Sequence, residues 1–423
     1  MAKEIEQMNW EGKLQRYYSL FSVPYTNLED TILKSQAGLE SNVILRTWPS
    51  IQEYVARTIQ AYHRQEVQIQ TITPVMGRQR NSAATVSYAL GDEQHSAFIK
   101  GFDFVMPSLY IRSGALLPMR PEVLKRENYE QENLLLPLFY SHGCFTPQYL
   151  GSFESDGNCF ILLRKYDAIT FDKQVQSLAG EKLVAGLAAA ASTLGKFHVR
   201  ATAHLDELIT AMKKNQIPTW NMTNKERFES LWLKWHSLRY PYLGALSKEN
   251  LNELDSVRKA AIGILTGPEK YILHYDMWPW NMLYNGNGQD HDPANPSLLI
   301  IDLEQVKIPT GPVAVSPMYD LSRILVWSET DLGSQLTEDE ENQIIRQYLQ
   351  AVNEETPAPT GKLEDTERLR QQILAGKLAA FDVRRWTEYR AELTGAIHDD
   401  TACSAASQGS ERTWQELRKI VGK

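Results

Sequence analysis

The stretch HYDMWPWNMLY, residues 274–284, is aromatic and apolar, yet it carries a histidine, an aspartate and an asparagine. Asp276 and Asn281 lie five residues apart, on either side of a Trp-Pro-Trp turn. Pro279 prevents a regular helix here, because proline has no backbone N–H and its ring clashes with the preceding turn. The pattern therefore predicts a loop that leads into a short apolar strand and holds polar side chains at fixed positions.

A second polar group follows in SLLIIDLEQV, residues 297–306, where Asp302 and Glu304 stand at the end of a strongly apolar strand. An acidic group at the end of a buried strand is costly unless it is paired or binds a metal. The connecting segment NGNGQDHDPANPS is rich in turn residues, which predicts a hairpin-like pair of strands. This pairing would bring Asn281 near Asp302, with Asp276 beside them.

These oxygen-bearing side chains suit phosphoryl transfer. One carboxylate orients the attacking hydroxyl and accepts its proton, while another carboxylate and an amide oxygen hold magnesium ions at the nucleotide phosphates. Mg²⁺ is a hard cation that prefers oxygen ligands, which explains why Asp and Asn rather than His or Cys occupy these positions.

The rest of the chain predicts an α+β fold with two lobes. Residues 67–163 alternate apolar and polar positions in several short runs around one helical segment, which indicates a small β-rich N-lobe. Residues 164–423 follow the helical period and form a larger C-lobe, and residues 1–66 predict a helical N-terminal extension. In the C-lobe the period predicts one long helix over 181–208 and another over 226–243.

Composition excludes several classes of protein. The chain has 423 residues, is 43% hydrophobic and 23% charged, and carries a net charge of -8 without a long basic run, so nucleic acid is a poor candidate partner. The longest uncharged apolar run, at 183–194, is too short and alanine-rich to span a membrane. Three scattered cysteines and a charged N-terminus predict a cytoplasmic protein without disulfides or structural zinc.

The H-x-D-x₄-N pattern, followed about twenty residues later by I-D-x-E, resembles the catalytic core of the aminoglycoside phosphotransferase and choline kinase superfamily. These small-molecule kinases have a protein-kinase-like fold. The resemblance implies that Asp276 is the catalytic base and that His274 supports the loop. It also implies that Asn281 and Asp302 bind magnesium, with Glu304 as the second acid of the motif.

Other segments match this superfamily in the expected order. The resemblance implies that Lys100 binds the nucleotide phosphates and that the next helix supplies its glutamate partner, Glu132 in preference to Glu130. The helix that contains Asp320 would anchor the catalytic loop. The remaining nucleotide-binding residues implied are in the loop that covers the nucleotide and in the hinge FILLRKY: Gly77, Asn81, Ser82, Leu163 and Tyr166.

Each of these residues also has a purely structural interpretation. Lys100 could be a solvated lysine at a strand end, and the glutamates could belong to an exposed helix face. Gly77 could simply serve a hairpin turn. Trp278 and Trp280 could pack in the core or line an acceptor pocket, and His198 is expected to satisfy a core hydrogen bond rather than take part in chemistry.

The expected function is transfer of the γ-phosphate of ATP, with Mg²⁺, to a hydroxyl group of a small molecule in preference to an amine. Tyr275 and Trp280 stand where the superfamily often has glycine, so the acceptor stays open among an aminoglycoside, an amino-alcohol and a specialised-metabolite intermediate. Two alternatives remain: nucleotidyl transfer on a related fold, and a catalytically silent binding module. The sequence also leaves open the choice of ATP or GTP and the oligomeric state.

Overall fold

The chain folds into two units, each with its own hydrophobic core. In the computed structural model, unit 1 comprises Met1–Ser141 and Thr146–Asp167, and unit 2 comprises His142–Phe145 and Ala168–Lys423. The structure describes residues 43–75, 82–102, 109–112, 115–118, 121–217, 248–286, 288, 297–356, 367–393 and 400–421.

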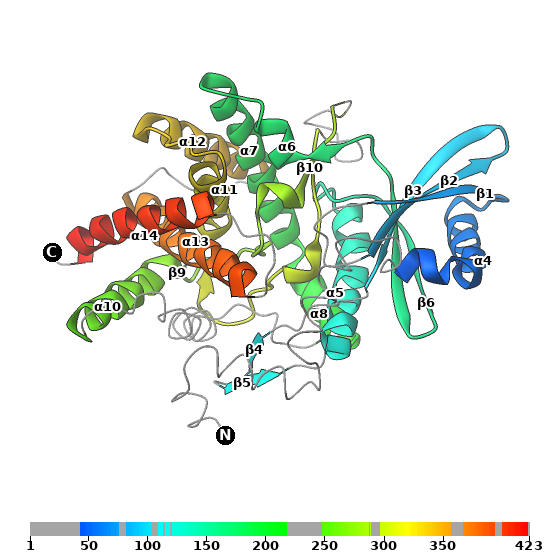
Figure 1. The fold of residues 1–423 in the computed structure, drawn as a ribbon, viewed down its shortest axis with the longest axis horizontal. Helices are drawn as coiled ribbons and strands as arrows, with labels where there is room; N and C mark the ends of the chain where they lie inside the picture. Colours follow the sequence, from blue (N-terminus) through cyan, green and yellow to red (C-terminus); the bar gives the residue numbers. More distant parts are fainter. Residues whose placement is uncertain are drawn as a thin grey trace. The chain divides into compact units, whose positions relative to one another are not determined.

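Unit 1 is built on a five-stranded antiparallel sheet in the order β1-β2-β3-β7-β6 (Figure 1). Its strands are β1 Gln68–Pro74, β2 Ser82–Leu90, β3 Glu93–Gly101, β6 Tyr149–Ser155 and β7 Asn158–Arg164. In the middle of the sheet, β3 pairs Lys100 with Ala83 on one side and with Ile161 on the other. Helix α5, Pro121–Ser141, packs against β6 and β7. The alternating runs of the sequence thus form one sheet with a helix beside it.

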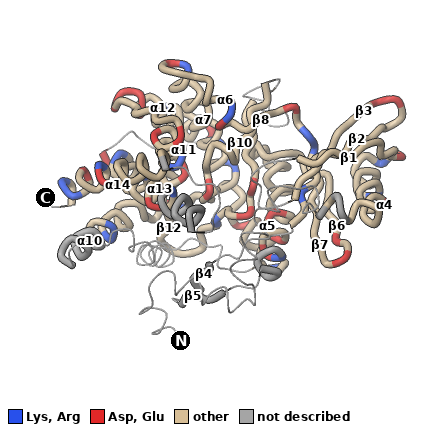
Figure 2. Tube along the Cα trace, viewed as in Figure 1, with Lys and Arg blue, Asp and Glu red and all other residues tan. Residues whose placement is uncertain are grey.

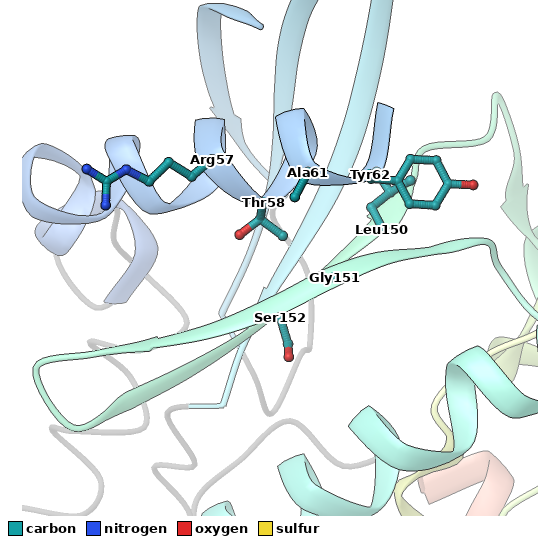
Figure 3. Close-up of a pocket in the computed structure, with 7 residues that line it drawn as sticks. All are labelled: Arg57, Thr58, Ala61, Tyr62, Leu150, Gly151 and Ser152. Atoms are coloured by element: carbon teal, nitrogen blue, oxygen red, sulfur yellow. The ribbon is translucent and has the colours of Figure 1, made fainter. Parts of the chain in front are cut away.

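Helix α4, Val43–His63, belongs to unit 1 and contributes Ile51, Val55 and Ile59 to the core of the sheet. It approaches β6 closely at Gly151, where a side-chain Cβ would overlap the methyl group of Thr58. Gly151 also has a φ of +147°, which L side chains rarely adopt. An open groove of about 470 Å³ runs along this contact, lined by α4 and β6 (Figure 3).

Unit 2 is mostly helical. Its helices are α6 Phe171–Val175, α7 Glu181–Ala203, α8 Leu205–Lys214, α10 Lys248–Leu265, α11 Met318–Asp331, α12 Glu338–Glu355, α13 Glu367–Leu393 and α14 Asp400–Val421. Its short strands are β8 Ile169–Thr170, β9 Thr266–Gly267, β10 Met282–Tyr284, β11 Leu298–Ile300 and β12 Ala314–Val315. Helices α10, α11, α13 and α14 contribute apolar residues to one core, and α13 contacts each of the other three.

The pair α7 and α12 forms a second tight contact in unit 2. Gly195 on α7 faces the backbone of α12, and a Cβ there would lie 2.8 Å from the carbonyl oxygen of Tyr348. Helix α12 begins with a capping box, in which Thr337 and Glu340 satisfy each other's backbone N–H groups. The acidic residues of its first turn stand out in red in Figure 2.

One sequence expectation meets a different outcome, and another cannot be compared with the described residues. The helix expected over 181–208 breaks at His204 (φ -109°, ψ 21°) into α7 and α8. Nearby, the hydroxyl of Thr202 accepts the backbone N–H of Ile272, a tertiary contact at the end of α7 that helical periodicity does not report. Unit 1 also contains a hairpin of β4 Leu109–Arg112 and β5 Ala115–Pro118, which precedes α5 in the chain. The helix expected over 226–243 lies outside the described residues.

Two further observations concern the chain as a whole. None of the three cysteines forms a disulfide, in agreement with their scattered positions. Within the part of the chain that the structure describes, every helix is too short or too polar to cross a lipid bilayer.

Candidate functional site

In unit 1, Lys100 and Glu132 form a buried ion pair between the sheet and α5. The Lys100 Nζ lies 2.6 Å from Glu132 Oε2, and the two residues are only 8% and 2% exposed. Two charges this far from water are tolerated when each has an opposite partner. The lysine also lies 4.9 Å from the ring centre of Phe102. Lys100 is therefore not a solvated strand-end residue.

The ion pair also decides between the two candidate glutamates on α5. Glu130 instead accepts a 2.6 Å hydrogen bond from Arg126 at the more exposed side of the helix. The glutamate that reaches Lys100 is Glu132, the one favoured from the sequence.

The other predicted nucleotide-binding residues are spread along unit 1. Ser82 is buried at the start of β2, and Leu163 lies in β7, opposite Phe98 and Tyr149. Tyr166 follows β7, and its hydroxyl accepts a 3.2 Å hydrogen bond from the backbone N–H of Gln148. Gly77 and Asn81 lie outside the described residues. The nucleotide-binding role of these five residues stays a prediction.

In unit 2, HYDMWPWNMLY forms the predicted loop and strand. Pro279–Asn281 make one 3₁₀ turn, and β10 begins at Met282. Asn281 Nδ2 donates to the backbone oxygen of Asp276 at 2.7 Å and lies 3.3 Å from its Oδ2. Asn281 thus holds the aspartate from within the loop.

A second partner of Asp276 comes from α11. Arg323 Nη2 lies 3.1 Å from Asp276 Oδ1, and Nη1 of the same guanidinium donates to the backbone oxygen of Tyr275. Arg323 itself is nearly buried, whereas the side chain of Asp276 is 30% exposed. The two carboxylate oxygens are therefore fixed by different side chains, while one face of the group stays accessible to solvent.

The Asp320 side chain anchors the loop by accepting hydrogen bonds from the loop's backbone, as the sequence predicted. Its Oδ2 accepts the N–H of His274 at 2.7 Å, and its Oδ1 accepts the N–H of Tyr275 at 2.9 Å. Tyr275 has a φ of +67°, an uncommon conformation for a bulky residue, so the loop needs such an external support. The carboxylate is fully buried, where each accepted hydrogen bond offsets the loss of water.

A buried hydrogen-bonded chain extends from Asp320 to α12. His198 Nε2 lies 3.1 Å from Asp320 Oδ2, and His198 Nδ1 lies 2.8 Å from the hydroxyl of Tyr348. Burial raises the pKa of Tyr348 well above its usual value, so its hydroxyl keeps its proton and can donate to Nδ1. His198 can then donate from Nε2 to Asp320. This arrangement is the core hydrogen bonding expected for His198.

The predicted pairing of the two apolar runs is present. Strands β10 and β11 are antiparallel, and the N–H of Ile301 donates to the oxygen of Asn281 at 3.0 Å. His274 Nε2 lies 2.8 Å from the oxygen of Ile301, so the histidine ties the loop to the end of β11. Asp302 follows directly, and these bonds place it beside the residues of the loop.

Asp302 and Glu304 offer oxygen atoms for a cation. Asp302 has φ 65° and ψ 58°, a left-handed conformation that turns the chain out of β11 into the 3₁₀ turn Leu303–Gln305. Carboxylate oxygens of Asp302 and Glu304 lie within 4.8 Å of each other, and Glu304 is 3% exposed. Because the amide nitrogen of Asn281 faces Asp276, its Oδ1 is the atom that can ligate an ion. This all-oxygen donor set fits Mg²⁺.

The two tryptophans of the loop have different surroundings. Trp278 is buried, and the Arg323 guanidinium lies 4.5 Å from its ring centre. Trp280 stacks on Trp278 at 5.2 Å but is only partly buried. The core-packing interpretation therefore holds for Trp278, and a role in contacting an acceptor stays open for Trp280.

Sequence reasoning missed Arg323. Its position offered a signal, because it lies three residues after Asp320 on the same helix and therefore on nearly the same face. An arginine in the apolar run YDLSRILVW is costly without an acidic partner, and Asp276 is that partner.

The described residues have the α+β architecture predicted from the sequence, with an antiparallel sheet in unit 1 and mostly helices in unit 2. Among solved structures, the chain is similar to a protein assigned as a fructosamine-3-kinase from Haemophilus somnus 129PT, with 11% identity and a TM-score of 0.38, over 86% of this chain and 96% of that one. It is also similar to an aminoglycoside-3'-phosphotransferase of type VIII, with 13% identity and a TM-score of 0.34, over 76% and 98%. No family model and no curated protein matches the sequence. We therefore infer function from the contacts of the chain itself.

Proposed function

We propose that the protein is an ATP-dependent phosphotransferase that moves the γ-phosphate to a hydroxyl group of a small molecule. The observation that carries this proposal is that several neighbouring side chains hold the carboxylate of Asp276 in a fixed position. Asn281 and Arg323 fix its two oxygens, and Asp320 holds the backbone on which it stands. A carboxylate held this firmly but still 30% exposed is suited to orient an incoming hydroxyl group.

In this proposal Asp276 accepts the proton of the acceptor hydroxyl as the oxygen bonds to phosphorus, and ADP leaves with the electrons of the broken P–O bond. Asn281, Asp302 and Glu304 would hold magnesium, which neutralises phosphate charge when bound. Lys100, kept in position by Glu132, would bind phosphate oxygens of the nucleotide. Catalysis would then rest on positioning and charge neutralisation.

The acceptor is proposed at the level of chemical class. An amino-alcohol, an aminoglycoside or a specialised-metabolite intermediate would supply the hydroxyl group, and an acidic protein of net charge -8 suits a cationic acceptor. Trp280 is the loop residue placed to contact it, because it is partly exposed while Trp278 is buried.

The test is release of ADP from Mg-ATP across a panel of hydroxylated acceptors, with mass spectrometry of any product. Asp276→Asn is the critical variant, and Asp339→Asn, at an exposed position in the first turn of α12, is its matched control. We expect one added phosphate with the parent and Asp339→Asn, and a loss of at least about a hundredfold in rate with Asp276→Asn. Normal turnover by Asp276→Asn would refute the assignment.

The same experiment separates the alternatives. Addition of AMP rather than phosphate would identify a nucleotidyltransferase. Binding of Mg-ATP without turnover of any acceptor would favour a silent binding module, although the intact set of Lys100, Asp276, Asn281 and Asp302 argues against it.

A further inference from the structure

Outside the proposed active site, unit 2 brings together two histidines and a glutamate that are far apart in sequence. His142 belongs to the short segment His142–Phe145, which follows α5 in the chain. His204 is the residue at which α7 ends and α8 begins, and Glu207 lies in the first turn of α8. The phosphotransferase chemistry uses none of these three side chains.

Two of the three distances between these side chains are close to those between ligands of one metal ion. Glu207 Oε2 lies 3.2 Å from His142 Nε2 and 3.4 Å from His204 Nδ1. One ligand atom from each residue lies within 4.8 Å of the others. A tetrahedral ion with ligand bonds of about 2.0–2.2 Å separates neighbouring ligand atoms by about 3.3–3.6 Å. The glutamate oxygen is thus close to the right distance from both nitrogens.

The helix break at His204 creates this proximity. A continuous helix was expected here, but the ψ of 21° at His204 turns the chain so that α8 starts a new direction. His204 and Glu207, three residues apart, then face the same side. The imidazole of His142 stacks on that of His204, with ring centres 3.3 Å apart and planes within 10°.

His142 provides a second, independent observation. Its Nε2 is buried and has no hydrogen bond, although Glu207 Oε2 lies 3.2 Å away. A buried ring nitrogen in this situation is costly unless something binds it. The side chain of Glu207 is 51% exposed, so an ion can reach the group from solvent.

We propose that His142, His204 and Glu207 form a binding site for a divalent cation of the zinc type, with water as the fourth ligand. Imidazole nitrogen suits Zn²⁺, Cu²⁺ and Ni²⁺, whereas Mg²⁺ and Ca²⁺ prefer oxygen. A His₂Glu set with one open position is a common zinc arrangement. Because each nitrogen binds metal in the plane of its ring, the stacked imidazoles must turn their planes apart for both to bind one ion. The bound ion would tie the segment His142–Phe145 to the junction of α7 and α8.

The test uses the full chain with Zn²⁺, in a large excess of Mg²⁺ that occupies the oxygen sites. We expect one equivalent of Zn²⁺ to bind by calorimetry and to raise the melting temperature. Co²⁺ in its place should give the intense visible absorption of a tetrahedral site with nitrogen ligands, whereas an octahedral oxygen site absorbs weakly. Asp302→Ala should retain both signals, which separates this site from the proposed catalytic one.

Two variants decide the outcome. His204→Ala and Glu207→Gln should each weaken Zn²⁺ binding by at least about tenfold and remove the Co²⁺ absorption. The matched control is His95→Ala, since His95 lies 3.4 Å from Glu93 but belongs to no group of three ligands among the described residues. If His204→Ala fails to fold, the exposed Glu207 still provides the test through Glu207→Gln. Unchanged Zn²⁺ affinity in Glu207→Gln, or an octahedral Co²⁺ spectrum in the parent, would overturn the proposal.

Discussion

The two units hold their candidate functional side chains in different ways. In unit 1, Lys100 is held by a side chain, through one ion pair with Glu132 between a strand and a helix. In unit 2, the loop that carries Asp276 is held by its backbone, through two N–H groups that donate to the buried Asp320. A network that includes His198 and Tyr348 then supports Asp320.

This difference has a consequence for how each region responds to substitution. A side-chain ion pair can be removed as a unit, and the strand and helix that carried it keep their own hydrogen bonds. A buried carboxylate that accepts backbone N–H groups cannot be removed without leaving those groups unsatisfied. Unit 2 should therefore couple activity to stability more strongly than unit 1.

The largest effect is expected from Asp320→Ala. The substitution leaves two buried backbone N–H groups and His198 without their acceptor, so the free energy of unfolding should fall by about 3–5 kcal/mol. Urea denaturation measures it. Asp320→Asn keeps one acceptor oxygen, so its free energy of unfolding should fall by less. If Asp320→Ala lowered the free energy of unfolding by less than Asp320→Asn does, Asp320 would not be the anchor of the loop backbone.

The next largest effect is expected from a substitution in the Lys100–Glu132 ion pair of unit 1. Glu132→Gln should lower the free energy of unfolding by about 1.5–3 kcal/mol, because it leaves Lys100 with a weaker partner at a buried site. The double variant Lys100→Met with Glu132→Gln should recover part of that loss, since both charges are gone. The affinity of this double variant for Mg-ATP, measured by calorimetry, should stay low, because it lacks the lysine proposed to bind phosphate. Recovery of nucleotide binding in the double variant would show that Lys100 does not contact phosphate.

A smaller effect is expected from Arg323→Met, which removes one of the two side chains that fix Asp276. We expect kcat/KM to fall by about 10- to 30-fold, which corresponds to about 1.4–2 kcal/mol of transition-state stabilisation. Steady-state kinetics with an acceptor found in the panel assay provides the measurement. Arg200→Met is the control, because it breaks the pair with Glu355 elsewhere in unit 2. Equal losses in both variants would indicate a general effect of removing an arginine.

The smallest effect concerns the packing that supports the network. Gly195→Ala would place a methyl group 2.8 Å from the carbonyl oxygen of Tyr348, so α7 and α12 must separate slightly. We expect a loss of about 1 kcal/mol in the free energy of unfolding. Gly263→Ala on α10 meets no atom within 4 Å and should instead be neutral or slightly stabilising. A destabilised Gly263→Ala with an unchanged Gly195→Ala would disprove the close-packing explanation.

Much of the fold and of the site was predictable from local pattern. The runs that became β1 and β2 alternate apolar and polar residues, and the run that became β7 is short and apolar. The turn-rich segment before Ser297 correctly indicated that β10 and β11 pair. In the loop, Pro279 and the spacing of Asp276 and Asn281 predicted their proximity, because five residues across a turn leave few alternatives.

The rest depended on contacts between distant residues. The pairing of Arg323 with Asp276 joins α11 to the loop, and the choice of Glu132 over Glu130 depends on which side of α5 meets β3. The break at His204 comes in a segment without proline, where helical periodicity alone gives no stop signal. In each case the deciding partner lies far away in the sequence, beyond the range of local propensity.

Helix α4 also bears on where the chain can be shortened. Its residues Ile51, Val55 and Ile59 cover apolar positions of β2 and β3, such as Val86 and Ile99, in a single cluster. A fragment beginning at Val67 would keep every strand of the sheet, but the hydrophobic surface that α4 covers would be exposed to water. We expect such a fragment to self-associate or precipitate. For expression and crystallisation, the natural starting point of unit 1 therefore lies before Val43 rather than at the first strand.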